Sequence, residues 1–285
     1  MAATLVSAAL FAVMGLWVKE AAAHLASPEI VFCRSLVPAL LLLPYLWRAR
    51  QGVRANGWLL LLRGALGGAA MMCYFWSIAR IRYADANLLC NLSPLFTAFL
   101  AAGLLHEPLS RRVRYALPLA LVGVYLIVRP AGASVFDIAG YGIGLLAGVL
   151  SGASCVAVRK LTQAVGPEVV VGAFSWVTVV MAAPVALSNW QWPGWTDTAL
   201  LLGVALSATG AQLFMTVGYR ELPAALAGTV GLVQVPMAAV LALSLLHEGI
   251  GLPQIVGMAV VLGAVGSLTA EGLPPLDVPA ATAAQ

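Results

Sequence analysis

Long runs of apolar residues, broken only by short stretches with charge, proline or glycine, extend along almost the whole sequence. Of the 285 residues, 62% are hydrophobic and 9% are charged, whereas soluble domains carry about 25% charged residues. Such a chain cannot cover a water-facing surface, so a soluble globular enzyme is excluded. Disorder is excluded as well, because polar residues are what the chain lacks. The sequence therefore predicts an all-α protein that crosses the membrane several times.

The apolar runs divide into ten segments separated by short loops. They are residues 3–18, 29–47, 58–78, 84–105, 114–128, 138–157, 168–187, 198–219, 224–246 and 253–270. A membrane-spanning helix needs about 20 apolar residues, so the segments predict ten transmembrane helices and leave no room for a soluble domain. Residues 271–285, rich in proline and alanine, are expected to form a cytoplasmic tail.

The distribution of basic residues predicts the orientation. If the amino terminus is cytoplasmic, ten basic residues fall on the inner side: Arg48, Arg50, Arg54, Arg63, Arg111, Arg112, Arg114, Arg159, Lys160 and Arg220. Four fall on the outer side, Lys19, Arg80, Arg82 and Arg129, and Arg34 lies within a span. Because cytoplasmic loops carry an excess of Lys and Arg, both termini are expected in the cytoplasm.

An internal repeat relates the two halves of the chain. Leu104-Leu105-His106-Glu107 recurs 141 residues later as Leu245-Leu246-His247-Glu248. The same offset relates Lys19 to Lys160, Ala84 to Ala225, and Ala86 to Ala227. We expect two five-helix units, residues 1–130 and 131–270. Since five is odd, the units must insert with opposite orientations, a pattern typical of secondary transporters whose substrate site lies between the repeats near the midplane.

Several motifs in the first half resemble those of a known family. They are Ser27-Pro28 to Arg34-Ser35 ahead of Leu43-Pro44, then Arg63-Gly64, Tyr74-Phe75-Trp76, Ala84-Asp85-Ala86-Asn87, Ser93-Pro94-Leu95-Phe96-Thr97 and Glu107-Pro108-Leu109-Ser110. With the ten-segment pattern, they make the chain up to about Thr269 resemble the EamA-type drug/metabolite transporter superfamily. The second half departs more: it keeps Glu248, but its seventh segment has no arginine equivalent to Arg34.

The resemblance implies a ten-helix fold with a central cavity and alternating access. It also implies export of small metabolites across the inner (plasma) membrane. The family includes bacterial amino acid and metabolite exporters, such as the aromatic amino acid exporter, and carriers of some cationic drugs. It does not indicate which substrate this chain carries.

Two repeat-related spans combine an amide with a proline. Asn87 and Asn91 precede Pro94 in the fourth span, and Gln234 precedes Pro236 in the ninth. Proline kinks a helix and frees backbone carbonyls, so these amides are candidate substrate ligands and the two prolines are candidate kink or gating residues. The alternative is a structural kink whose amide bonds to a neighbouring helix.

Large side chains in other spans could line the expected cavity. Met71 and Tyr74 share one helix face, and the 141-residue offset relates them to Gln212 and Met215. Trp17 and Trp176 are further candidates, because aromatic rings stack on aromatic or cationic solutes. Any of these side chains could instead pack or face lipid.

Four charged residues near the ends of spans also need an interpretation. Arg34 could bind a substrate carboxylate, extend to the headgroups or pair with Glu29, whereas Arg63 is interpreted as a topology or lipid anchor. Glu107 and Glu248 are expected to cap the amino terminus of the following helix. The eleven acidic residues all lie at or near span ends, so no carboxylate is expected at membrane depth.

These features favour an exporter of amino acids, with large neutral or aromatic ones preferred. The alternatives are export of cationic drugs or nucleobases, or a channel-like facilitator. An intramembrane enzyme is disfavoured because the three histidines all lie at span ends. We expect no cofactor, metal ion or nucleic acid. The expected partners are a small-molecule substrate and the lipid bilayer, with the protein a monomer or weak dimer.

Overall fold

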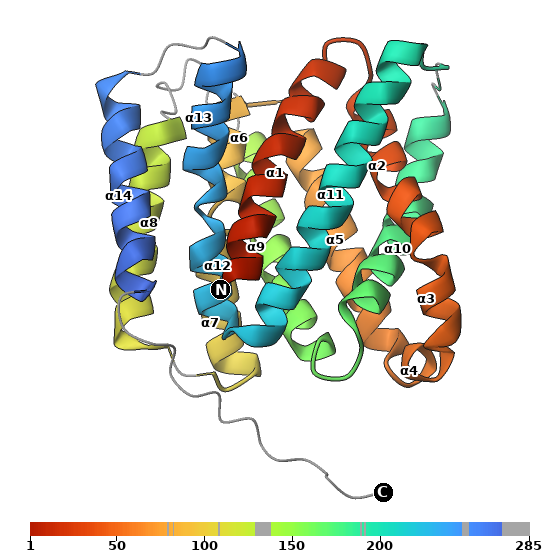
Figure 1. The fold of residues 1–285 in the computed structure, drawn as a ribbon, viewed down its shortest axis with the longest axis horizontal. Helices are drawn as coiled ribbons and strands as arrows, with labels where there is room; N and C mark the ends of the chain where they lie inside the picture. The colour runs from red at the N-terminus through yellow and green to blue at the C-terminus, as the bar shows by residue number, and fades with distance from the viewer. Residues whose placement is uncertain are drawn as a thin grey trace, which may run out of the picture.

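A computed structural model describes residues 1–78, 80–81, 83–107, 109–128, 138–188, 190, 192–246 and 251–269. All regular secondary structure in these ranges is helical (Figure 1). The first half contains α1 (Ala2–Ala21), α2 (Ser27–Leu41), α3 (Leu43–Arg48), α4 (Arg50–Ala55), α5 (Gly57–Ile78), α6 (Tyr83–Cys90), α7 (Ser93–Leu104) and α8 (Arg111–Val128). The second half contains α9 (Ile138–Leu161), α10 (Pro167–Ser188), α11 (Trp195–Glu221), α12 (Ala224–Gly231), α13 (Gln234–Leu246) and α14 (Leu252–Thr269).

Each of the ten predicted segments coincides with a helix or with two consecutive helices. Among the described residues, seven helical stretches are long and apolar enough to cross a membrane: Ala2–Ala21, Gly57–Ser77, Ala86–Leu104, Ile138–Leu161, Pro167–Ser188, Trp195–Glu221 and Ala224–Leu245. The other three segments are shorter or less apolar. The second is divided between α2 and α3 at Leu42, α8 begins with three arginines in four residues, and α14 is a shorter apolar helix. The chain is thus a multi-pass helical membrane protein.

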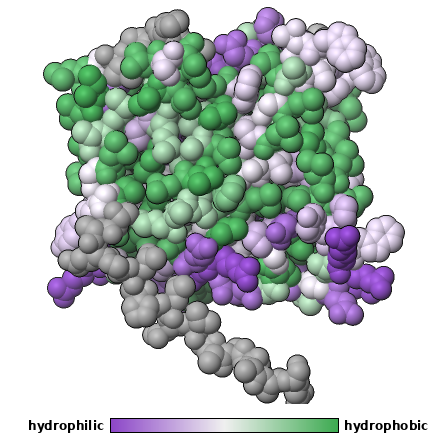
Figure 2. All heavy atoms as spheres, viewed as in Figure 1, coloured by the Kyte–Doolittle hydropathy of each residue, from purple (hydrophilic) through white to green (hydrophobic). Residues whose placement is uncertain are grey.

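On the face drawn in Figure 2, an apolar belt crosses the middle of the bundle, and polar residues gather at its ends. The end that carries α3 and α4, at the bottom of both views, also holds the start of α8 and the carboxyl-terminal ends of α9 and α11 (Figure 1). We call this end the basic face. Its exposed basic side chains are Arg48, Arg50, Arg54, Arg111, Arg112, Arg114, Lys160 and Arg220.

The sequence repeat extends to the helix boundaries. Helix α12 begins and ends 141 residues after α6, and α14 begins and ends 141 residues after α8. The packing partners also exchange between halves: α1 packs on α11 while its counterpart α9 packs on α5, and the two members of the pair α8 and α14 pack on each other. The repeat is therefore a property of the helices as well as of the sequence.

The fourth and ninth segments are both interrupted, at equivalent positions. Helix α6 ends at Cys90 and α7 begins at Ser93; α12 ends at Gly231 and α13 begins at Gln234. Pro94 is the second residue of α7 and Pro236 the third of α13. Because proline lacks a backbone N–H, it is tolerated at the start of a helix and disfavoured inside one. The chain stops and restarts here, which is a sharper change than the kink that the sequence predicted.

Glycines let α5 and α9 approach their neighbours closely. A methyl group on Gly64 would lie 2.5 Å from Cβ of Val177 in α10. One on Gly152 in α9 would lie 2.9 Å from the backbone nitrogen of Thr97 in α7. Small residues at helix interfaces are the usual means of close packing in membranes. Here they bring α5, α7, α9 and α10 together around one polar cluster.

Candidate functional site

Arg63 of α5 lies inside the bundle with 5% of its surface exposed. Its Nη1 donates a hydrogen bond to Oγ of Ser154 in α9 at 2.7 Å, and its Nη2 donates to Oε1 of Gln212 in α11 at 3.4 Å. The guanidinium carbon lies 4.2 Å from the centre of the Phe174 ring in α10. Four helices from both halves of the chain therefore converge on one cation.

The guanidinium group lies well inside the membrane-spanning region. A methyl group on Gly67 would collide with Nη1 of Arg63, so the side chain extends along α5 as far as position 67. That position is ten residues from the start of a 22-residue helix, or about 15 Å along a helix of about 33 Å. Gly67 thus leaves the space that the guanidinium occupies near the middle of α5.

Arg63 has no carboxylate partner within the described part of the chain. Its Nε is buried and makes no hydrogen bond there. A buried guanidinium without a counter-ion is costly in a membrane protein and marks a functional site by default. Since guanidinium offers five donors in a planar fork that matches a carboxylate, the arrangement suits an anionic group of a ligand.

The interpretation of Arg63 as a lipid or topology anchor is wrong. An anchor side chain would be exposed at the membrane surface, whereas that of Arg63 is buried among Ser154, Gln212 and Phe174. The sequence feature that could have indicated a buried Arg63 is Gly67, one helical turn later. A small residue at that spacing leaves room for the arginine side chain to extend along its own helix.

A polar column connects Arg63 with the basic face. Below Ser154 and Gln212, the side chain of Tyr219 in α11 lies near those of Cys155 in α9 and Thr97 in α7. The side chain of Tyr219 is 4% exposed and that of Thr97 fully buried. We define the polar column as Arg63, Thr97, Ser154, Cys155, Gln212 and Tyr219. It follows one face of α9 and α11 toward their carboxyl-terminal ends.

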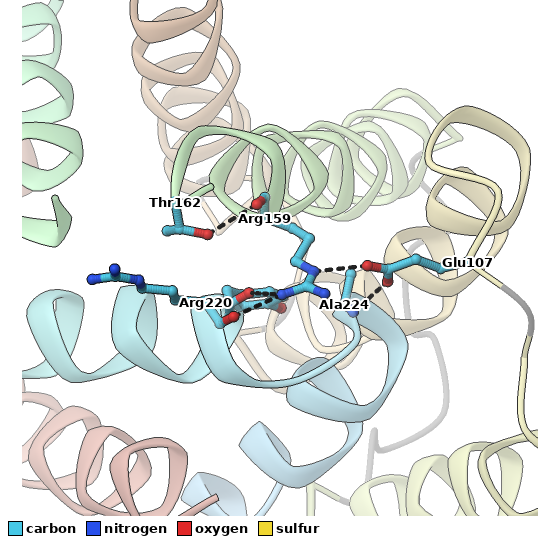
Figure 3. Close-up of polar contacts among 6 residues, drawn as sticks. Glu107, Arg159, Thr162, Arg220 and Ala224 are labelled. Carbon is cyan, nitrogen blue, oxygen red and sulfur yellow. Dashed lines mark hydrogen bonds and ion pairs between the residues drawn. The ribbon is translucent and has the colours of Figure 1, made fainter. Parts of the chain in front are cut away.

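An ion-pair network covers the lower end of the polar column (Figure 3). Nε of Arg159 in α9 donates to Oε1 of Glu107 at 2.7 Å, and Nη1 donates to the carbonyls of Tyr219 and Arg220 at 3.0 and 2.8 Å. Oε2 of Glu107 accepts a hydrogen bond from the backbone nitrogen of Ala224 at 2.8 Å. We call these five residues the basic-face network. A cation thus lies at the end of α11 and an anion at the start of α12, which suits both helix dipoles.

Glu107 contacts a helix end in the other half of the chain. The sequence suggested that it caps the following helix, α8, but its carboxylate accepts from the first residue of α12. The start of α8 is capped by Ser110, whose Oγ accepts from the backbone nitrogen of Val113 at 3.3 Å. Glu248, the second expected cap, lies outside the described residues.

The candidate amides separate into two groups. Gln212 accepts a hydrogen bond from Arg63. Asn91 is 8% exposed, and its Nδ2 donates to the carbonyl and to Oδ1 of Asn87 at 2.9 and 3.0 Å, so these two amides pair with each other at the break between α6 and α7. Gln234 is half-buried at the equivalent break, as the first residue of α13.

The remaining candidates lie on several helices. Trp17 is 41% exposed, and its ring packs against Gly203 of α11. The indole N–H of Trp176 is buried and has no acceptor among the described residues. The half-buried candidates are Arg34 on α2, Met71 and Tyr74 on α5, and Met215 on α11. The hydrogen bonds of the Arg63 guanidinium within the described ranges go to Ser154 and Gln212.

An apolar belt, interrupted helices in register and a buried cation shared by both halves define a multi-pass membrane transport protein. The chain belongs to the EamA-like transporter family, whose model matches residues 1–129 and 138–269. This confirms the resemblance that the sequence motifs indicated. Members of the family transport solutes rather than catalyse reactions, so the protein is not an enzyme.

Curated relatives carry transport functions of different kinds. The chain is 34% identical over 210 residues to the pseudopaline exporter CntI of Pseudomonas aeruginosa, covering 72% of this chain and 73% of that protein. It is 26% identical over 263 residues to an uncharacterized transporter of Helicobacter pylori, covering 88% of each. It is 28% identical over 235 residues to solute carrier family 35 member G1 of Mus musculus, covering 75% of this chain and 62% of that protein.

A solved crystal structure shares the fold. It superposes with a TM-score of 0.79 at 18% sequence identity, covering 94% of this chain and 96% of that one. The comparisons therefore establish membrane transport and the fold. None of the three relatives is named for an amino acid, so they leave the substrate to be argued from the site.

Proposed function

We propose that the protein is an alternating-access exporter of small solutes that carry a carboxylate, with large neutral or aromatic amino acids as the preferred class. The observation that carries this proposal is the buried guanidinium of Arg63, which has no carboxylate partner in the described chain and an unused Nε donor. The carboxylate of the solute supplies the missing anion, and Phe174 beside the guanidinium provides a ring surface for an aromatic side chain.

The same observation ranks the alternatives. A cationic drug requires a carboxylate on the protein side, and the partners of Arg63 within the described part of the chain are a hydroxyl, an amide and a ring. A nucleobase would leave the buried positive charge without an anion. A channel-like facilitator needs an open path, whereas the basic-face network covers the end of the polar column.

Two oppositely inserted repeats of five spans, residues 1–130 and 131–270, form the proposed carrier. In support, the amino group of Met1 at the start of α1 lies 3.5 Å from Glu221 at the end of α11, which places the start of α1 at the basic face. Its repeat counterpart α9 ends at that face with Arg159 and Lys160. These opposite directions of α1 and α9 support an inverted repeat, and a substrate site between such repeats is expected near the midplane.

The basic-face network is the proposed inner gate. Opening it requires the pair between Glu107 and Arg159 to separate, which would release the ends of α7, α9, α11 and α12 from one another. The excess of arginine supports a cytoplasmic basic face, with both termini on that side of the inner (plasma) membrane. A solute would enter from this side, bind with its carboxylate as the counter-ion of Arg63, and leave on the opposite side.

Counterflow into proteoliposomes tests the substrate class. Vesicles preloaded with unlabelled phenylalanine should take up labelled phenylalanine, and excess large neutral amino acids should compete. Phenylalaninamide is the matched control, because it keeps the ring and the amine and lacks the carboxylate. The proposal fails if phenylalaninamide competes as well as phenylalanine, or if nucleobases or quaternary amines compete and amino acids do not.

A further inference from the structure

An apolar groove of about 380 Å³ lies between the interrupted helix pair α6 and α7 and the outer face of α8. Its lining residues are Leu88, Leu92, Leu95, Pro118, Leu121, Val122 and Tyr125. Val122 and Tyr125 are 54% and 53% exposed, so the groove opens on the outside of the bundle. It is separate from the polar column, which contains none of these residues.

Two arginines continue the same face of α8 toward the basic face. Arg114 lies four residues before Pro118, about one helical turn, and Arg111 lies eleven residues before Val122, about three turns. Both arginine side chains are exposed. Tyr115, beside them, is 76% exposed, and tyrosine is enriched at the headgroup level of membranes. One helix face therefore presents two cations at the membrane surface and an apolar groove directly above them.

We propose that this surface binds an anionic phospholipid from the leaflet at the basic face. One acyl chain lies in the groove along α8, and the headgroup phosphate is bound by Arg111 and Arg114. Charge complementarity selects this occupant, because paired guanidinium groups bind phosphate oxygens at short range and basic sites beside membrane helices recognise anionic headgroups. The inference rests on the membrane location of α8 and is independent of the transported solute.

An acyl chain in the groove would lie against the break between α6 and α7. Leu92 belongs to the two-residue break between α6 and α7, and Leu88 and Leu95 lie on either side of it. Asn91, the other residue of the break, is held by its hydrogen bonds to Asn87. A chain bound against Leu92 therefore contacts the interrupted helix directly and would stabilise one arrangement of it.

Native mass spectrometry of the whole protein in detergent tests the site. Phosphatidylglycerol and phosphatidylcholine with identical acyl chains are titrated against wild type and two charge-matched double variants. Arg111→Gln with Arg114→Gln should weaken binding of phosphatidylglycerol about 25-fold, roughly five-fold for each arginine. Arg50→Gln with Arg54→Gln is the control, because α4 lies on the other side of the bundle from α8 (Figure 1) and should leave this binding unchanged.

A third variant tests the groove itself. Val122→Trp fills the groove with an apolar side chain and leaves the two arginines in place. It should weaken the binding of both phosphatidylglycerol and phosphatidylcholine. The proposal is overturned if both double variants weaken phosphatidylglycerol equally, since the effect would then be one of net charge. It is also overturned if Val122→Trp leaves lipid binding intact. A third contrary result would be that the wild type forms a dimer and Val122→Trp removes this dimer without changing lipid binding to the monomer.

Discussion

Arg63 and Arg159 are two arginines inside the same bundle with opposite surroundings. Arg159 is 14% exposed in its side chain and is satisfied by the carboxylate of Glu107 and by two carbonyls at the end of α11. Arg63 is 5% exposed and bonds only neutral groups, Ser154 and Gln212. The first arrangement holds helices together, and the second leaves a charge that the protein itself does not neutralise.

This difference separates a structural cation from one prepared for a ligand. Removing one member of a buried pair is destabilising, because the other charge is left alone. Removing a cation that has no counter-ion carries no such penalty, so the two arginines should respond oppositely in stability.

The largest effect is expected on substrate binding when Arg63 is replaced by Gln. Loss of charge-assisted hydrogen bonds to a carboxylate costs up to about 3 kcal/mol, or roughly 100-fold in Kd. Stability should stay constant or rise, because an uncompensated buried charge is removed. Binding is measured by equilibrium titration in detergent and stability by the thermal midpoint. Arg48→Gln is the control, since its side chain is exposed at the basic face. A Kd within three-fold of wild type for Arg63→Gln would assign the site elsewhere.

Breaking the pair between Glu107 and Arg159 should lower stability and open the basic face. Glu107→Gln removes the charge opposite Arg159 and weakens the hydrogen bond to Ala224, so a loss of about 2 kcal/mol is expected. Cys155, one helical turn from Arg159, should then react faster with a membrane-impermeant maleimide added from that side. Mass spectrometry of the labelled peptide measures the rate.

Ser110→Ala is the matched control for this gate. It removes the cap of α8 in the same loop, which costs about 1 kcal/mol, and does not touch the basic-face network. Equal acceleration of Cys155 labelling in both variants would mean that general loosening, rather than the ion pair, limits access.

Gly67→Ala should have an intermediate effect, because it displaces Arg63 without removing its charge. The added methyl group would collide with Nη1 of Arg63 and lie 2.8 Å from the Phe174 ring. Overpacking of this kind costs about 1–3 kcal/mol, and we expect a weaker substrate affinity, by roughly ten-fold. Gly142→Ala in α9, where no atom lies within 4 Å of the added methyl, serves as control. If the two variants bind substrate alike, the position of the guanidinium does not determine affinity.

Much of the fold was predictable because the lengths of the apolar runs and the internal repeat can be read from the sequence. The ten segments predicted the helices, and the 141-residue offset predicted where the second half would repeat the first; beside Pro94 and Pro236, where the sequence predicted kinks, the structure has breaks. Division of the second segment at Leu42 was not predicted, because Pro44 lies inside a continuous apolar run. Local composition cannot distinguish one continuous transmembrane helix from two consecutive helices that are equally apolar.

The candidate site was only partly predictable, because the position of a residue within a span does not reveal which other helices its side chain contacts. Arg34 and Arg63 lie at similar distances from opposite span ends, and the sequence offered Arg34 as a possible substrate ligand and Arg63 as an anchor, whereas Arg63 is 5% exposed inside the bundle. What distinguishes Arg63 is tertiary: Ser154, Phe174 and Gln212 come from three other helices. Likewise, the contact of Glu107 with α12 joins residues that are 117 positions apart.

The smallest effect is expected at the break between α6 and α7. Asn91→Ala removes the hydrogen bonds to Asn87, worth about 1 kcal/mol, without touching either arginine. If the break acts as a hinge, the exchange rate in counterflow should fall roughly three-fold while the Kd stays at the wild-type value. Leu92→Ala in the same break provides a comparison that keeps the amide pair. A change in Kd as large as that of Gly67→Ala would instead make Asn91 part of the binding site, and the cation of α5 would no longer be its centre.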